Sequence, residues 1–400
     1  MGVSEEYQAL INDFITRYLS REEVMRRLPL HISILDFYPD LLHARRQQGQ
    51  ILPLMSQEGK EFWFTVNPSI TRQVDRISAA ARRENVLKPW VLDRLQENAV
   101  IEEAVFSSMI EGAFTTKDEA ERMLKNTRQP RNKSEQMVKN NYDALNYVLE
   151  HLHAEITMET LVQIAGILTK DASEKEVTGY RTSQVVIAGQ EGLVYTPPPG
   201  DRVPEMMDSL IRFMKTSSLH PVLKACIAHF YFVYVHSFFD GNGRTARALS
   251  LMILLQAGFD FFRTFPISGL VAKERGKYYK AIRDAENADG DMTFFVDVYS
   301  GMLSRALEQM EHEVTYRLMA QQWMNRLDES GKLNIRQLEG ARWLLTNEKN
   351  QVTADAWKKK FQTVTETARQ DLLLLCELGL LTRRMNGKRA VFDINRTNTE

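Results

Sequence analysis

The sequence contains few cysteines and no long apolar run. Only two of its 400 residues are cysteines, Cys226 and Cys376, which is too few for a disulfide framework and typical of a reducing compartment. The longest apolar stretch, residues 249–257, is shorter than the about 20 residues needed to cross a bilayer. The first residues lack the basic and then apolar pattern of a secretory signal. We therefore expect a cytoplasmic protein with no membrane partner.

An excess of charge of one sign is also missing. The chain has 51 Lys and Arg against 52 Asp and Glu, a formal net charge of −1. This balance argues against a chain built throughout to bind nucleic acid or acidic membranes. Residues 331–400, however, contain 13 Lys and Arg against 8 Asp and Glu, a net charge of +5. A small nucleic-acid-binding module therefore remains possible in this last segment.

Helical periodicity dominates the sequence. Apolar residues recur at helical spacing over residues 91–110. Ser20 and Glu23 form a capping-box pattern, which predicts that one helix ends near Tyr18 and the next begins at Arg21, and Thr115 or Thr116 could cap a helix that runs to about residue 126. Further predicted helices lie at residues 134–151, 158–168, 206–215, 221–235, 244–257, 273–285 and 294–327.

Strands are predicted in three places. Residues 184–196 have short β-prone runs around glycines and predict a hairpin, while residues 30–64 could hold short strands but show no clear period. At the end of the chain, Asn386-Gly387 is a strong hairpin turn between two strands. Helices are expected before it at residues 335–345, 354–361 and 366–378, the last with a capping box at residues 363–366. Three helices and a basic hairpin predict a winged helix.

Residues 236–247, His-Ser-Phe-Phe-Asp-Gly-Asn-Gly-Arg-Thr-Ala-Arg, carry the chemistry. Gly241 and Gly243 permit a tight turn, and N–H groups at such a turn before a helix form an anion-binding nest. Arg244 and Arg247 are three residues apart, so they share a helix face and could both reach phosphate oxygens. This half of the segment predicts phosphate binding.

Two further side chains in the segment suit a reaction at phosphate. Asp240 is a hard oxygen ligand that could hold Mg²⁺ jointly with phosphates. A neutral imidazole at His236 could take a proton from an attacking hydroxyl. The segment therefore indicates phosphoryl or nucleotidyl transfer by positioning, charge neutralisation and proton removal.

The segment resembles the signature of the Fic/Doc family, His-x-Phe-x-[Asp/Glu]-Gly-Asn-Gly-Arg-x-x-Arg, at eight fixed positions. It departs at Ser237, where the family commonly has proline. The resemblance implies AMPylation: AMP is transferred from ATP, with Mg²⁺, to a Ser, Thr or Tyr hydroxyl of a target protein, and possibly of the enzyme itself. The fold it implies is mainly α, a Fic-fold helical core with a β-hairpin flap, here followed by a winged helix-turn-helix domain.

The resemblance also assigns roles. His236 would be the general base, Asp240 would hold Mg²⁺, Asn242, Gly243 and Arg244 would cradle the α- and β-phosphates, and Arg247 would bind the γ-phosphate. One of two neighbouring tyrosines could pack near the adenine, and the other would be core. The implied nucleotide-binding residues are Gly241, Asn242, Gly243, Arg244, Arg247, Tyr278 and Tyr279. The implied flap residues, which would pair with the target segment like a strand, are Val185, Val186 and Ile187.

A second motif lies upstream. Residues 107–112, Ser-Ser-Met-Ile-Glu-Gly, are similar to the family's inhibitory pattern, [Ser/Thr]-x-x-x-Glu-[Gly/Asn]. Ser107 and Glu111 are four residues apart, so they face one way on a helix. The resemblance implies that Glu111 pairs with Arg247 and blocks the γ-phosphate position. A solvated helix residue is the alternative for Glu111.

The predicted organisation has four parts: residues 1–90, mostly helical; a Fic domain at 91–300 with an inhibitory helix near 101–112; a linker helix at 301–327; and a winged helix at 328–400. Two other functions remain open. The same site could remove AMP, with Glu111 positioning a water, or the chain could be a DNA-binding regulator with a nucleotide-sensing core. The winged helix could contact DNA or protein, and a homodimer is possible.

Overall fold

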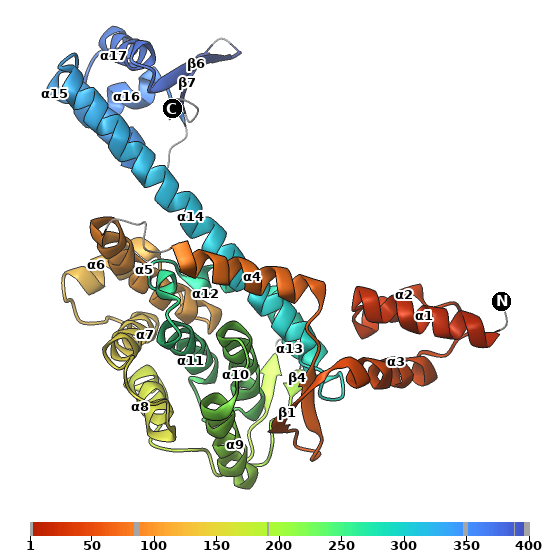
Figure 1. Cartoon of the computed structure of the whole chain (residues 1–400). Coiled ribbons are helices and arrows are strands. Elements are labelled where there is room, and N and C mark those ends of the chain that lie inside the picture. The colour runs from red at the N-terminus through yellow and green to blue at the C-terminus, as the bar shows by residue number, and fades with distance from the viewer. Residues whose placement is uncertain (1–2, 84–88, 190–191, 347–350, 388, 396–400) are drawn as a thin grey trace. The chain divides into compact units, whose positions relative to one another are not determined.

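The chain is mainly helical, as predicted (Figure 1). A computed structural model describes residues 3–83, 89–189, 192–346, 351–387 and 389–395. The chain divides into two compact units, Met1–Gln309 and Met310–Glu400. The finer division into four parts stays a prediction. None of the helices in the described part of the chain is long and apolar enough to span a membrane.

The first unit begins with three helices and a small hairpin. Ser20 caps the second helix, and the Glu23 carboxylate accepts the Ser20 backbone N–H, so the predicted capping box is confirmed. The third helix occupies part of the segment for which only short strands were predicted, and it contains Pro39. The elements are α1 (Val3–Arg17), α2 (Arg21–Arg27), α3 (Ile34–Gln48), β1 (Gln50–Met55) and its antiparallel partner β2 (Glu61–Phe64).

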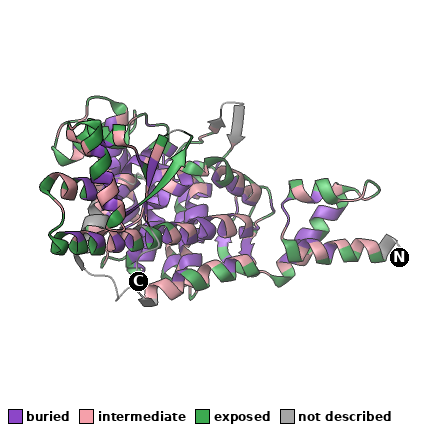
Figure 2. Cartoon of the chain, turned by 90° about the horizontal axis from the view of Figure 1, so that it is seen from above, coloured by how far each residue is buried: buried purple, intermediate pink, exposed green. Residues whose placement is uncertain are grey.

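The remainder of the first unit is a helical body. Almost every residue of α10 (Pro221–Val235) is buried, as expected for a central helix that is apolar on all sides, and α10 packs against α11 (Asn242–Gln256). Figure 2 shows buried residues filling the interior of this body and exposed ones on its outer helix faces. The helices before α10 are α4 (Pro68–Arg83), α5 (Pro89–Ile110), α6 (Lys117–Lys125), α7 (Lys133–Glu150), α8 (Met158–Thr169) and α9 (Val203–Thr216).

The predicted hairpin between α8 and α9 is present. It pairs β3 (Ile187–Gly189) with β4 (Gly192–Tyr195) in antiparallel fashion. Thr116 caps α6, as one of the two predicted alternatives. The helices after α11 are α12 (Ile267–Lys273), which was not predicted, α13 (Arg275–Glu286) and α14 (Thr293–Ser330), whose residues belong to both units.

Besides its part of α14, the described part of the second unit has three helices and a three-stranded sheet in the order β5-β7-β6. Asp371 is buried at its centre and accepts hydrogen bonds from Arg336 Nε at 2.9 Å, Gln337 Nε2 at 2.8 Å and Trp357 Nε1 at 3.0 Å, so it joins all three helices. The elements are α15 (Ile335–Thr346), β5 (Gln351–Val352), α16 (Ala354–Phe361), α17 (Thr365–Glu377), β6 (Leu381–Asn386) and β7 (Arg389–Ile394). The predicted helices and hairpin are present, and their assignment as a winged helix stays a prediction.

One predicted cap in this unit is wrong. The N-cap of α17 is Val364, which has no side-chain oxygen, rather than Thr363. The Thr363 N–H instead donates to Lys358 O, after Gln362 at φ +47°, so Thr363 completes the end of α16. Only three residues separate α16 from α17, and the backbone of Thr363 is bonded to the end of α16, so the residue that precedes α17 is Val364.

Candidate active site

His236 lies in the connection between α10 and α11. It caps the C-terminus of α10 in the left-handed conformation, with φ +52° and ψ +60°, and its N–H donates to Phe232 O at 3.1 Å. Such a backbone is uncommon for a residue with a side chain and needs support from its surroundings. The imidazole is half-buried, and its Nδ1 is buried without a partner among the described residues.

The loop that follows is closed by a side chain. Asn242 Oδ1 accepts the Phe238 N–H at 3.0 Å, and Asn242 Nδ2 donates to Phe238 O at 2.8 Å. Phe238 is fully buried and anchors the loop. Gly241 has φ +81° and immediately precedes the first turn of α11. The amide of Asn242 is therefore committed to the loop, and what residue 242 can offer a phosphate is its backbone N–H.

The first backbone N–H groups of α11, which follow this loop, are not used within the helix. Thr245 N–H donates to Gly241 O at 2.8 Å, which closes the first turn. The N–H groups of residues 242–244 precede that bond and have no partner within the helix. With the positive end of the helix dipole, they form the anion-binding site that the motif predicts.

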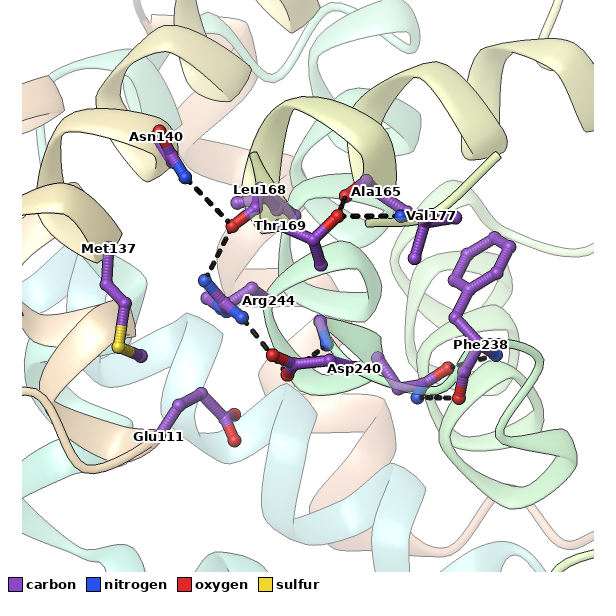
Figure 3. Close-up of polar contacts among 12 residues, drawn as sticks. Glu111, Met137, Asn140, Ala165, Leu168, Thr169, Val177, Phe238, Asp240 and Arg244 are labelled. Carbon is purple, nitrogen blue, oxygen red and sulfur yellow. Dashed lines mark hydrogen bonds and ion pairs between the residues drawn. The ribbon is translucent and has the colours of Figure 1, made fainter. Parts of the chain in front are cut away.

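Asp240 is oriented by a buried arginine (Figure 3). Its Oδ1 accepts from the Gly241 N–H at 2.5 Å and from Arg244 Nη2 at 3.2 Å. The Arg244 side chain is 1% exposed, and its Nη1 donates to Leu168 O, at the end of α8, at 2.9 Å. Arg244 thus holds Asp240 in place from the interior, and the geometry favours this positioning role over direct contact of its guanidinium with phosphates.

The Asp240 carboxylate fits a magnesium ion shared with phosphates. It is 43% exposed at the mouth of the loop, and only its Oδ1 is engaged in hydrogen bonds. No cluster of three or more His, Cys, Asp or Glu side chains that could hold a metal alone occurs among the described residues. One carboxylate plus substrate phosphates is a usual way to bind Mg²⁺, which retains several waters.

Both residues of the upstream motif contact Arg247. Its Nε donates to Ser107 Oγ, and its Nη2 donates to both Ser107 O and Glu111 Oε1, each at 2.9 Å. Arg247 is 3% exposed and Glu111 30% exposed, and the proximity of Glu111 raises the pKa of Arg247 against the effect of burial. Arg247 Nη1 is buried without a partner among the described residues. Ser107, Glu111 and Arg247, separated by 140 residues of sequence, therefore form one cluster.

Gly243 is required by this cluster. A Cβ at residue 243 would lie 2.2 Å from Glu111 Oε1 and 3.3 Å from Arg247 Nη1. In Figure 3 the Glu111 carboxylate points toward the side of the loop that carries Asp240. Glu111 thus occupies the space directly over the first turn of α11, where an anion would bind.

His236 is suited to accept a proton. Burial, and then the charge of Arg181, lower its pKa to about 4, while Glu111 and Asp240 act in the opposite direction. The imidazole is therefore neutral at pH 7, and a neutral imidazole is the form that can act as a general base.

The two tyrosines differ. Tyr278 is buried, and its hydroxyl lies 2.8 Å from Nε2 of buried His229, so the expected nucleotide contact is wrong for Tyr278, which belongs to the core. Tyr279 is half-buried, and Glu111 and Arg247 are near enough to act on its pKa in opposite directions. Only Tyr279 stays a candidate.

The flap residues lie at the first leg of the hairpin. Val186 is 62% exposed, Val185 is half-buried, and Ile187 is half-buried where it begins β3. The exposure of Val186 is compatible with the predicted flap, and pairing of this segment with a target stays a prediction.

Sequence reasoning gave no role to Arg181. A buried arginine that bonds to distant carbonyls leaves no periodic signal in the sequence. Arg181 is fully buried, and its Nε donates to His236 O at 2.7 Å.

Comparison with known proteins agrees with the geometry. Residues 155–254, which include the whole loop and the start of α11, match the family model for the Fic/DOC family. The chain contains a Fic domain. The resemblance inferred from residues 236–247 is confirmed, while the match does not extend to Glu111.

Curated relatives of this Fic domain are proteins named "Protein adenylyltransferase Fic". The one from Drosophila virilis is 30% identical over 157 residues, which is 38% of this chain and 30% of that protein. The one from Nematostella vectensis is 30% identical over 153 residues, which is 37% of this chain and 33% of that protein. The chain thus spans about a third of the length of these relatives.

Solved structures show the same fold. A Fic family protein from Desulfovibrio desulfuricans G20 matches with a TM-score of 0.55 at 19% identity, over 84% of this chain and 98% of that one. Fic-1 (aa134–508) from C. elegans matches with a TM-score of 0.55 at 18% identity, over 78% of this chain and 85% of that one. These likenesses confirm the Fic-type helical core.

Proposed function

We propose that this protein is a protein adenylyltransferase, which transfers AMP from ATP to a hydroxyl side chain of a target protein. The observation that carries the proposal is the loop between α10 and α11, where neutral His236, the free N–H groups of α11 and the oriented Asp240 are held together. The names of the curated relatives support the same reaction.

The reaction needs a base and an anion site. His236 takes the proton of the target hydroxyl as its oxygen bonds to the α-phosphorus of ATP, and the bond from that phosphorus to the pyrophosphate oxygen breaks. The N–H groups of residues 242–244 hold the phosphates and stabilise the charge that develops on them. Asp240 would hold Mg²⁺, which when bound neutralises phosphate charge.

The same geometry supports autoinhibition. Arg247 is the buried cation closest to the space over Gly243, and Glu111 occupies one of its Nη2 donors. A γ-phosphate that seeks Arg247 must displace this carboxylate, whose negative charge also repels the nucleotide. Held by Arg247, Glu111 thus blocks productive binding of ATP, and loss of Glu111 activates the enzyme.

ATP labelled at either end tests the proposed reaction. The Glu111→Gly variant, incubated with α-labelled ATP and a cell lysate, should transfer more label to protein than the lysate alone, whereas γ-labelled ATP should give no label beyond that of the lysate alone. Label that arrives only from the γ-position would show a kinase and overturn the proposal. Release of AMP from a previously AMPylated protein by the wild-type chain would instead support the reverse reaction.

The second unit favours an acidic partner, and we propose nucleic acid. Several of its cations beyond residue 350 are exposed and form no ion pair with a carboxylate among the described residues. They are Lys358, Lys359, Lys360, Arg369, Arg383 and Arg389. Binding of duplex DNA by the full chain should weaken steeply with salt and in Lys359→Glu, but not in the control Lys273→Glu of the first unit. No binding at low salt would refute this contact.

A further inference from the structure

Arg181 donates hydrogen bonds to four backbone carbonyls. Its Nε reaches His236 O at 2.7 Å, and its Nη2 reaches Val235 O at 3.1 Å and Pro198 O at 2.5 Å. Its Nη1 reaches Ser183 O at 3.0 Å. The side chain is fully buried and forms no ion pair with a carboxylate in the described part of the chain, so the dipoles of these carbonyls stabilise its charge.

The four carbonyls belong to two structures. Ser183 enters the flap and Pro198 leaves it, so Arg181 joins the two legs of the hairpin at their base. The legs are also in close contact at Gly200, where a Cβ would lie 2.4 Å from the carbonyl carbon of Thr182. The two legs of the flap are thus held together at their base, and the Arg181 guanidinium lies between them.

The other two carbonyls end α10, the helix that carries His236. The last carbonyls of a helix have no partner within it and must be satisfied from outside. Arg181 satisfies those of Val235 and His236, and the hydroxyl of Tyr195 in β4 donates to Tyr234 O at 2.9 Å. Three consecutive carbonyls at this helix end are therefore bonded by groups of the flap base, and a cation at a helix C-terminus is electrostatically favourable.

We propose that Arg181 is a positioning residue that couples the flap to His236, so that the segment expected to hold the target and the residue expected to accept its proton are set by one guanidinium. This inference rests on the proposed function for its catalytic consequence, but not for the coupling itself. The left-handed backbone of His236 at φ +52° is held by these bonds, including Arg181 N–H to Ser237 O at 2.9 Å. An error of about 1 Å in such a contact can cost about 100-fold in rate.

The charge of Arg181 also acts on the base. After burial, it is the next largest cause that lowers the pKa of His236, while Glu111, just after the end of α5, and Asp240 in the loop act in the opposite direction. Loss of the charge should therefore move the titration of His236 upward, whereas a residue that only fills space would leave it unchanged.

Two substitutions separate geometry from charge. Arg181→Lys keeps the charge but loses the planar fork that serves four carbonyls, and Arg181→Met loses both. Arg45→Lys is the matched control, because Arg45 is also fully buried and donates to two carbonyls, Phe14 O and Leu19 O, far along the chain from the site. Each variant is prepared as the full chain, and its fold is checked by circular dichroism.

Hydrogen exchange and NMR read out the coupling without any activity. In both Arg181 variants the amides of β3 and β4 should exchange at least about 10-fold faster than in wild type, as expected for a flap freed at its base. The His236 ring should titrate at higher pH in Arg181→Met and as in wild type in Arg181→Lys. Unchanged flap exchange in a folded Arg181→Lys variant would overturn the proposal, even if Arg181→Met failed to fold.

Kinetics then test the catalytic consequence. In the Glu111→Gly background, both Arg181 variants should raise KM for the target and lower kcat, for a combined loss of about 10- to 100-fold, with ATP affinity unchanged. Arg45→Lys should leave both constants unchanged. If Glu111→Gly itself transfers no AMP, the proposed function fails, while the exchange result still decides the coupling. Loss of ATP affinity alone would contradict the inference.

Discussion

Removal of the Glu111 carboxylate should release Arg247 for the nucleotide. The change is Glu111→Gln, which keeps the size and an acceptor oxygen, compared with Glu111→Gly, which removes the group. Arg247 keeps both of its bonds to Ser107 in either variant, so only the third bond, 2.9 Å long, is altered. A hydrogen bond to a charged group contributes about 1.5–3 kcal/mol, against about 1 kcal/mol for a neutral one.

These energies set the size of the activation. Since about 1.4 kcal/mol corresponds to a factor of ten, Glu111→Gly should raise productive ATP binding by about 10- to 100-fold, and Glu111→Gln by about 3- to 30-fold. The rate of AMP transfer at subsaturating ATP measures this directly. Glu102→Gln on α5, the helix that Glu111 follows, is the control, because Glu102 pairs with Lys117 and its loss should leave the rate unchanged. Equal rates for wild type and Glu111→Gly, or activation by Glu102→Gln, would refute the reasoning.

Three further predictions concern stability. The pKa of His236 is lowered from 6.5 to about 4, so its neutral form stabilises the fold above pH 6.5, and that contribution is lost as the pH falls toward 4. Between pH 7 and pH 5, wild type should therefore lose about 2 kcal/mol more of its unfolding free energy than His236→Asn. Equal losses in the two proteins would contradict this. Gly243→Ala should lower the unfolding free energy, followed by thermal unfolding, by about 1–3 kcal/mol in wild type. The loss should be clearly smaller in the Glu111→Gly background, since the added Cβ clashes with Glu111. Identical losses in the two backgrounds would show that the destabilisation has another cause. Asp371→Asn should destabilise the second unit by about 2–3 kcal/mol in urea unfolding followed by tryptophan fluorescence, and a loss under about 0.5 kcal/mol would mean that its bonds to Trp357 and its other partners contribute little.

Local rules predicted most helices but not all of them. The caps at Ser20 and Thr116 are confirmed because a cap depends on a side chain and a backbone group three residues away. α3 was missed because Pro39 and scattered polar residues blur its period, although Ser33 caps it. α12 was missed because its 7 residues are too few for a period to show.

The site was predictable where it is local. The loop residues follow one another in sequence, and Ser107 and Glu111 are four residues apart, so their grouping could be inferred before the structure, although Glu111 lies in the turn after α5 rather than on the helix. The roles inside the loop could not: the amide of Asn242 closes the turn on Phe238, and Arg244 points inward to Leu168. Which hydrogen-bond donors of the loop remain available to a ligand depends on tertiary packing, and residue spacing in the sequence does not show it.

Long-range polar bonds were the main omission. Arg181 serves carbonyls up to 55 residues away, and which of Tyr278 and Tyr279 belongs to the core is decided by the hydrogen bond between the Tyr278 hydroxyl and His229. Neither bond could be inferred, because the sequence shows that a side chain is polar but not which buried group satisfies it.

The central claim is that His236 accepts the proton while AMP is transferred. Mass spectrometry of the Glu111→Gly chain and of the Glu111→Gly/His236→Ala chain, each incubated with ATP and a protein substrate, tests it most directly. The account predicts that the first chain adds the mass of one AMP to a hydroxyl side chain and that the second is slower by at least about 100-fold. Equal modification by both chains, or no modification by either, would contradict it.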